Sequence, residues 1–99
     1  MTVKLSLIIN DTPISTDYFV EGFIDHVVSG IIESLEDTGK IKELDLSIND
    51  GNVIINLNGT IVSTNPFASK IITGTIIGML STLKGVNNIK KLSIFLMKI

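Results

Sequence analysis

The 99-residue chain has no cysteine and no arginine, and all eight of its basic residues are lysines. The lack of cysteine excludes disulfides, thiolate metal sites and cysteine nucleophiles. The lack of arginine removes the side chain that most often binds phosphate, carboxylate or guanine through paired hydrogen bonds. The formal net charge is −2, and no basic stripe is visible. Because non-specific nucleic-acid binding depends on clustered Lys or Arg, we expect no nucleic-acid partner.

Long apolar runs are also missing, although the mean hydropathy is high, at +0.49. Polar residues interrupt the chain every few positions, so no stretch reaches the roughly 18 apolar residues of a membrane-spanning helix. The first seven residues, Met-Thr-Val-Lys-Leu-Ser-Leu, are typical of a strand and lack the design of a signal peptide. These features predict a soluble cytoplasmic protein, with a single domain over residues 1–99 and no membrane partner.

What the sequence does contain is a match to itself. Residues 4–51 align without a gap on residues 52–99, at an offset of 48 positions. Identical residues at matched positions include Asn10/Asn58, Thr12/Thr60, Ser15/Ser63, Thr16/Thr64, Phe19/Phe67 and Gly30/Gly78. A self-match at a fixed period constrains the whole architecture. It predicts two similar halves, 4–51 and 52–99, related by a pseudo-twofold axis.

Each half is predicted to contain a strand, a helix and a second strand. Residues 3–9 and 53–57 have the alternation of strands, and so do residues 41–48 and 92–99. Asn58-Gly59 favours a tight hairpin, and Asn10-Asp11 can make the same turn less well. A short extra arm is therefore expected over residues 12–14 and 60–62; the alternative is a plain loop into the helix.

Each predicted helix has a capping residue and a broad apolar face. Asp17 and Asn65 suit N-caps, and Pro66 suits the first helical position. Gly39 and Gly85 follow the apolar stretches and suit helix ends. The apolar faces comprise Phe19, Val20, Phe23, Ile24, Val27, Val28, Ile31, Ile32 and Leu35 in the first helix, and Phe67, Ala68, Ile71, Ile72, Thr75, Ile76, Met79, Leu80 and Leu83 in the second.

With right-handed crossovers, this element order predicts a ferredoxin-like βαββαβ sandwich. Its antiparallel sheet would have the order 4-1-3-2, with both helices on one face, and would be built from the tandem 48-residue repeat. The element order resembles many ferredoxin-like modules, but the signatures of three functional classes are missing. Residues 10–13 lack the cysteine pair of copper-chaperone-like domains, and the chain lacks the arginine of acylphosphatase-like enzymes. The two expected central strands lack the aromatic residues of RNA-recognition domains.

Polar residues shared by both halves cluster between the first strand and the helix N-terminus. A helix N-terminus with nearby hydroxyls can bind an anion, so the two loops are candidate sites for a metabolite or anion. Turns and helix caps need the same residue types, and this structural explanation is the preferred one. The candidate ligand-binding residues are Asn10, Thr12, Ser15, Thr16, Asn58, Thr60, Ser63 and Thr64.

On the predicted sheet, the face away from the helices carries an apolar patch over three adjacent strands. The patch consists of Ile8, Ile54, Phe95 and Met97. Because apolar patches of this kind often mark interfaces, the leading hypothesis is a non-catalytic protein-interaction or oligomerisation module. Its partner would be a second copy, giving a homodimer, or another protein. A regulatory domain that binds a small ligand through the two loops is the alternative.

His26 is the only imidazole of the chain, and it lies in the first predicted helix. Its matched position is Gly74, so we interpret His26 as a side chain that fills space between two closely packed helices. No carboxylates at suitable spacing complete a metal site around it, and no Ser-His-Asp arrangement is present. We therefore expect no enzymatic activity, no metal and no cofactor.

Overall fold

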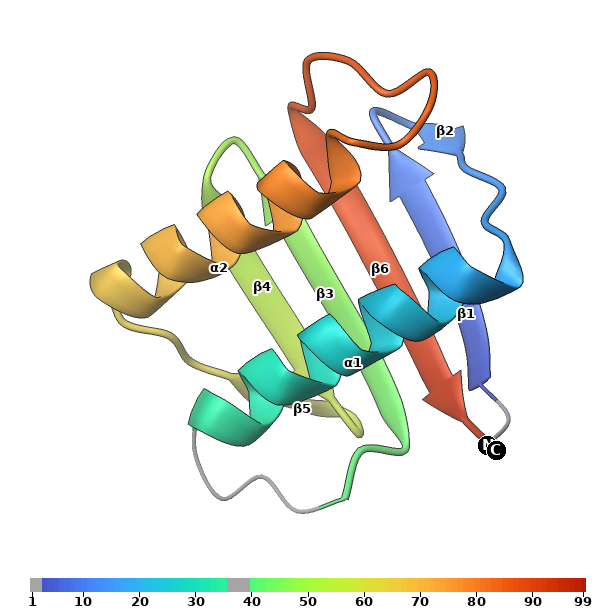
Figure 1. The fold of residues 1–99 in the computed structure, drawn as a ribbon. Helices are drawn as coiled ribbons and strands as arrows, with labels where there is room; N and C mark the ends of the chain where they lie inside the picture. Colours follow the sequence, from blue (N-terminus) through green and yellow to red (C-terminus); the bar gives the residue numbers. More distant parts are fainter. Residues whose placement is uncertain (1–2, 36–39) are drawn as a thin grey trace.

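The computed structural model describes residues 3–35 and 40–99. A six-stranded antiparallel sheet forms one layer, and two helices cover one of its faces (Figure 1). Neither of these two helices is long and apolar enough to cross a membrane. In chain order the elements are β1 (Val3–Ile9), β2 (Thr12–Pro13), α1 (Tyr18–Leu35), β3 (Glu43–Asn49), β4 (Asn52–Leu57), β5 (Thr60–Val62), α2 (Pro66–Leu80) and β6 (Lys91–Lys98).

The strand order is β2-β1-β6-β3-β4-β5. The predicted ferredoxin-like sandwich, with a 4-1-3-2 sheet built from a tandem 48-residue repeat, is therefore wrong. That fold would place β1 and β4 at the centre of the sheet, whereas the centre is formed by β6 and β3. Both arrangements contain the β1–β6 pair, the β3–β4 hairpin and two helical crossovers; they differ in which strand of each pair lies inside. The single-domain organisation of residues 1–99 stays a prediction.

The core lies between the sheet and the helices, and it is entirely aliphatic. On β3, Leu44, Leu46 and Ile48 are fully buried, while the alternate residues Glu43 and Asp45 face solvent. This alternation is expected of a strand with one covered face. Every buried hydrophobic residue of the described chain is Ile, Leu or Val. No aromatic side chain therefore contributes to the fully buried core.

The short arms after β1 and β4 are strands rather than plain loops. β2 pairs with the end of β1, and β5 pairs with the end of β4. Asn10 and Asp11 have φ values of 49° and 68°, and Asn58 and Gly59 have values of 51° and 86°. Positive φ at both central residues is the property of a type I′ turn. This turn type explains why asparagine begins both connections.

Both helices begin where their capping residues predict. The Asp17 carboxylate accepts a hydrogen bond from the Val20 N–H at 2.8 Å, and the Asn65 side chain accepts one from the Ala68 N–H at 2.7 Å. α2 ends at Leu80, so the prediction that Gly85 terminates it is wrong. Gly85 instead has a φ of 82° in the following loop. Gly39, the other predicted helix end, lies outside the described residues.

Candidate functional site

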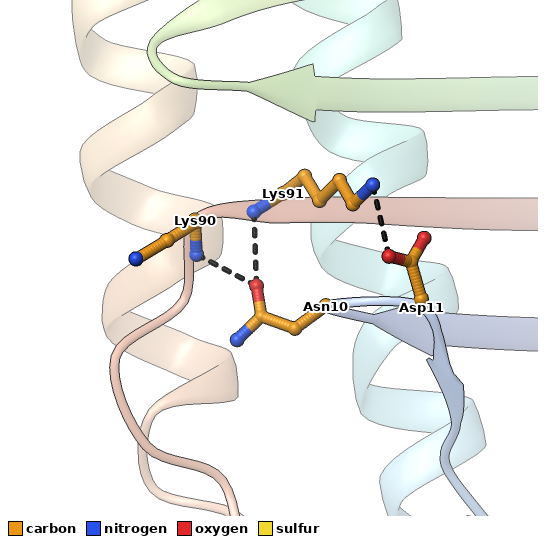
Figure 2. A network of polar contacts seen from close by, with 4 residues as sticks. All are labelled: Asn10, Asp11, Lys90 and Lys91. Carbon is orange, nitrogen blue, oxygen red and sulfur yellow. Dashed lines mark hydrogen bonds and ion pairs between the residues drawn. The ribbon is translucent and has the colours of Figure 1, made fainter.

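The side chain of Asn10 ties the β1–β2 turn to the start of β6 (Figure 2). Its Oδ1 accepts hydrogen bonds from the Lys90 and Lys91 N–H groups at 2.9 and 3.1 Å. Its Nδ2 donates to the Asn88 carbonyl at 3.0 Å. Next to it, the Asp11 carboxylate lies 3.0 Å from the Lys91 ammonium. The oxygen of this predicted ligand-binding residue is thus occupied by the chain itself.

Asn58 makes the corresponding contacts at the β4–β5 turn. Its Oδ1 accepts from the Lys42 and Glu43 N–H groups at 2.9 and 2.8 Å. Its Nδ2 donates to the Lys40 carbonyl at 2.8 Å. Asn10 and Asn58 therefore join each hairpin turn to the strand beside it. Their hydrogen bonds favour the structural explanation for both residues.

The other residues of the two predicted loops divide between the opposite edges of the sheet. Thr12 lies on β2 and Thr60 on β5, which are the two edge strands, so the two loops do not form one site. The Thr16 hydroxyl donates to the Glu21 carboxylate at 3.1 Å, and the Thr64 hydroxyl lies 2.6 Å from that of Ser69. Ser15 and Ser63 are exposed. Ligand binding by these loops stays a prediction.

The apolar patch predicted on the open sheet face is divided by polar residues. Ile8 and Ile54 belong to one row of paired residues, but Ser93 and Ser47 lie between them. Phe95 is flanked by Ser6 and Asp45 in the same way, and Met97 by Lys4 and Glu43. The observed strand order is the reason, because the polar strand β3 lies inside the sheet instead of at its edge. As an interface, this patch stays a prediction.

Large apolar side chains are exposed on both helices, near the starts of α1 and α2, which lie at opposite ends of the helix layer (Figure 1). The helix face, as we define it, consists of the exposed residues Tyr18, Phe19, Phe23, Phe67 and Ile71. Four of the five aromatic residues of the chain are in this group, with exposed fractions of 50–93%. The Phe19 and Phe23 rings lie 6.0 Å apart between centroids. The sequence pattern places Phe19, Phe23, Phe67 and Ile71 on the apolar helix faces, but the sheet covers only the opposite side of each helix.

Each helix also contains two glycines, Gly22 and Gly30 in α1 and Gly74 and Gly78 in α2. A Cβ atom built on Gly22, Gly30, Gly74 or Gly78 would meet nothing within 4 Å. Close packing of the two helices within the chain therefore does not account for these glycines. His26 is exposed rather than buried in a gap between the helices. The earlier interpretation of His26 as a space-filling residue is wrong.

A shallow groove of about 320 Å³ lies between the start of α1 and the end of α2. No charged residue lines it. Its lining residues are Phe19, Val20, Phe23, Ile24, Met79, Leu80, Thr82 and Leu83. The groove therefore extends the apolar helix face inward between the helices.

A larger cleft, of about 910 Å³, lies between β4, β5 and the first turns of α2. We name it the β4–α2 cleft. Lys70 is the one charged residue among those lining it, and Ser63 and Thr64 from the predicted ligand set also belong to its wall. Thr73 lines it as well, and the Thr73 hydroxyl is buried without a hydrogen-bond partner in the described part of the chain.

The unpaired hydroxyl makes Thr73→Val a stabilising substitution. Valine has nearly the same shape, so the change removes an unsatisfied buried polar group with little change in packing, and we expect a gain of about 1 kcal/mol in unfolding free energy. Urea denaturation followed by circular dichroism measures it. Thr75→Val, at an exposed position of the same helix, is the control and should be near neutral. A loss of stability at Thr73 would show that its hydroxyl has a partner.

Asp25 is the buried acid of α1, with an exposed fraction of 2%. It accepts a hydrogen bond from the Ser29 hydroxyl at 3.0 Å and lies 3.7 Å from the Lys98 ammonium. The buried carboxyl group of Asp25 therefore has polar partners on α1 and β6. Within residues 3–35 and 40–99, no group of three His, Cys, Asp or Glu side chains is arranged to bind a metal ion.

Comparison with known proteins finds no matching family model, no matching curated protein and no matching solved structure.

Proposed function

We propose that this chain is a non-catalytic protein-interaction or oligomerisation module that associates through its helix face. The observation that supports the proposal is the placement of the aromatic residues. Tyr18, Phe19, Phe23 and Phe67 are exposed on the helices, whereas the buried core is aliphatic. Aromatic side chains contribute strongly to association when they become buried, and they are enriched at interfaces.

The exposed apolar area of the helix face approaches that of such a contact. If full burial of an aromatic side chain removes about 150–250 Å² from water, the exposed parts of the helix face amount to about 600 Å². Apolar patches on typical monomers reach about 300–600 Å², and a standard interface buries about 800 Å² on each partner. The neighbouring groove between α1 and α2 adds to the area available.

Shape and charge also favour the helices over the open sheet face. The glycines of α1 and α2 have open space where a side chain would begin, so side chains of a partner can approach the helix backbone. On the open sheet face, by contrast, Glu43 and Asp45 lie on the central strand β3. An interface there would have to bury these carboxylates or leave them hydrated at its centre, which is costly without ionic partners.

Sedimentation velocity of two matched double variants tests this proposal. We expect the wild-type chain to self-associate, and Phe19→Ser with Phe67→Ser to weaken association at least about 100-fold, since one exposed aromatic contact is lost on each helix. The control is the double variant Ile8→Ser with Ile54→Ser, which changes two residues on the open sheet face. It should associate as strongly as the wild type. The proposal is wrong if the sheet-face pair dissociates the assembly and the helix-face pair does not.

The second candidate is a regulatory domain that binds a small metabolite or anion. One observation favours it, namely that Ser63 and Thr64 line the β4–α2 cleft beside Lys70. The equivalent residues of the first half favour it less, because Thr16 bonds to the carboxylate of Glu21.

A further inference from the structure

The outer edge of β4 is only partly covered. β5 pairs with Ile55, Asn56 and Leu57, so the first half of β4 has no strand on its outer side among the described residues. Within an antiparallel pair, backbone N–H and C=O groups of successive residues point alternately toward and away from the neighbour. Asn49 and Asn52 are the pair that closes the β3–β4 turn, so the backbone N–H and C=O of Asn52 point toward β3. The N–H and C=O of Val53 therefore point outward, and Val53 lines the β4–α2 cleft.

Nothing in β4 protects this free edge. Natural edge strands are usually guarded by a charged side chain, a proline or a bulge. β4 has the sequence Asn-Val-Ile-Ile-Asn-Leu, which contains neither charge nor proline. The opposite edge is different, because β1 carries Lys4 and its arm contains Pro13. An unprotected edge beside a cleft is suited to pairing with another extended chain.

The helix supplies the second wall of the cleft and its chemistry. The lining residues of α2 run from Pro66 to Gly74, so the cleft follows the helix for about two turns. The charge of Lys70 is not balanced by any acidic residue among the lining residues. The corresponding cleft beside α1 has the opposite character, since Glu21 and Asp25 line it and Gly22 occupies the position matched to Lys70.

We propose that the β4–α2 cleft binds an extended peptide that carries a carboxylate. The peptide adds a short strand beside β4, exchanges hydrogen bonds with the N–H and C=O of Val53, and places its carboxylate near Lys70. A groove between an edge strand and a helix is a known mode of peptide recognition, in which backbone pairing gives affinity and side-chain contacts give selectivity. This site goes beyond the proposed helix-face association, because it uses a different surface of the molecule.

Amide NMR of the full chain tests the site with defined probes. The acidic probe is the capped pentapeptide Ac-Thr-Val-Glu-Val-Thr-NH2, and its partner has lysine in place of glutamate. We expect the acidic peptide to bind with a Kd of about 0.1–1 mM, to shift the Val53 amide and to slow its hydrogen exchange. Because the Lys70 contact is solvent-exposed, we expect only about a threefold preference over the lysine peptide.

Two comparisons separate charge from backbone pairing. Lys70→Gln should remove the preference for the acidic peptide, whereas Lys84→Gln, in the loop after α2, should retain it. N-methyl groups on alternate amides of the acidic peptide can be placed in two registers. The register that methylates the amides facing β4 should abolish binding, because those amides can no longer donate hydrogen bonds to the strand. This second comparison leaves the protein unchanged, so misfolding of a variant does not affect it.

Several results would overturn the proposal. It is wrong if the Val53 amide is unaffected at about 5 mM peptide, well above the expected Kd, or if the shifts appear at Leu5 on the opposite edge instead. Equal binding of the two peptides to the wild-type chain would remove the role of Lys70. If self-association protects Val53 and the peptide does not compete with it, the occupant is a second copy. None of these outcomes alters the helix-face test, which uses Phe19 and Phe67.

Discussion

Leu46→Ala is expected to lower the free energy of unfolding by about 2–5 kcal/mol, the range for a leucine truncated in a closed core. Leu46 is fully buried at the middle of β3, and its direct neighbours are Ile94 on β6 and Ile55 on β4. All three side chains are inaccessible to solvent. Because the central strands support them on both sides, the site has little freedom to collapse around the cavity.

A loss of this size is a large part of the stability of a small domain, which is about 5–15 kcal/mol in total. We expect the midpoint of thermal unfolding to fall by about 10–25 °C. Urea denaturation gives the free energy directly. Ile54→Ala is the control, since its side chain is 56% exposed on the open face of the adjacent strand, and it should cost less than about 1 kcal/mol. Similar costs for the two variants would contradict the burial described for Leu46.

The second large effect is expected at Asn58. Asn58→Ala removes the three hydrogen bonds to Lys40, Lys42 and Glu43. It also puts alanine, which disfavours positive φ, at a position where φ is 51°. With a net contribution of about 0.5–1.5 kcal/mol for each of the three hydrogen bonds and about 1 kcal/mol for the backbone conformation, the total loss is about 2.5–5.5 kcal/mol. Asn10→Ala should behave alike, because its side chain makes the corresponding contacts.

Glycine at the same position separates the two contributions. Asn58→Gly keeps the backbone conformation accessible but loses the side-chain hydrogen bonds, so it should recover only about 1 kcal/mol of the alanine effect. Asn88→Gly is the matched control, because Asn88 also has a positive φ, of 47°, but contributes only its carbonyl to the Asn10 contact. If Asn58→Gly is as stable as the wild type, the side-chain hydrogen bonds contribute nothing to the fold.

Local features of the fold were predictable because they depend on neighbouring residues. Asn65-Pro66 contains both the cap and the first residue of α2, and the structure confirms that start. The positive φ values of Asn58 and Gly59 agree with the predicted tight turn. The helix end at Leu80 was not predicted, since the apolar pattern continues to Leu83 and the chain leaves the helix without a glycine there.

Strand order was not predictable in this way. The same hairpin and the same two crossovers fit both the expected and the observed sheet, and the alternation of β3 predicts one buried face in either. What distinguishes the two sheets is a pairing between segments far apart in sequence, because β6 pairs with β3, whereas the expected sheet pairs β1 with β4. Matching asparagines before β2 and β5 were visible in the sequence, but their partners at Lys90 and Lys42 were not.

The helix face could have been found from the width of the apolar stripe. A helix on a sheet buries one side, and in α1 that side contains Ile24, Val28 and Ile32. Phe19 lies nine residues before Val28, which places it on the opposite side of a helix with 3.6 residues per turn. An apolar surface that continues around a helix needs cover on both sides. The width of the stripe therefore indicates a second apolar surface on α1, beyond the side that faces the core.

The position of β1 in the sheet has a consequence for synthesis on the ribosome. β1 is made first, yet its long neighbour is β6, the last strand of the sheet to be made, which pairs with it from Val3↔Lys98 to Ile9↔Leu92. Until then β1 has only the short β2 beside it, whereas β3 and β4 can already form their hairpin. The growing chain therefore carries an apolar strand without its main partner for most of translation. Unpaired strand edges of this kind are prone to aggregation, so we expect β1 to need protection until β6 is made.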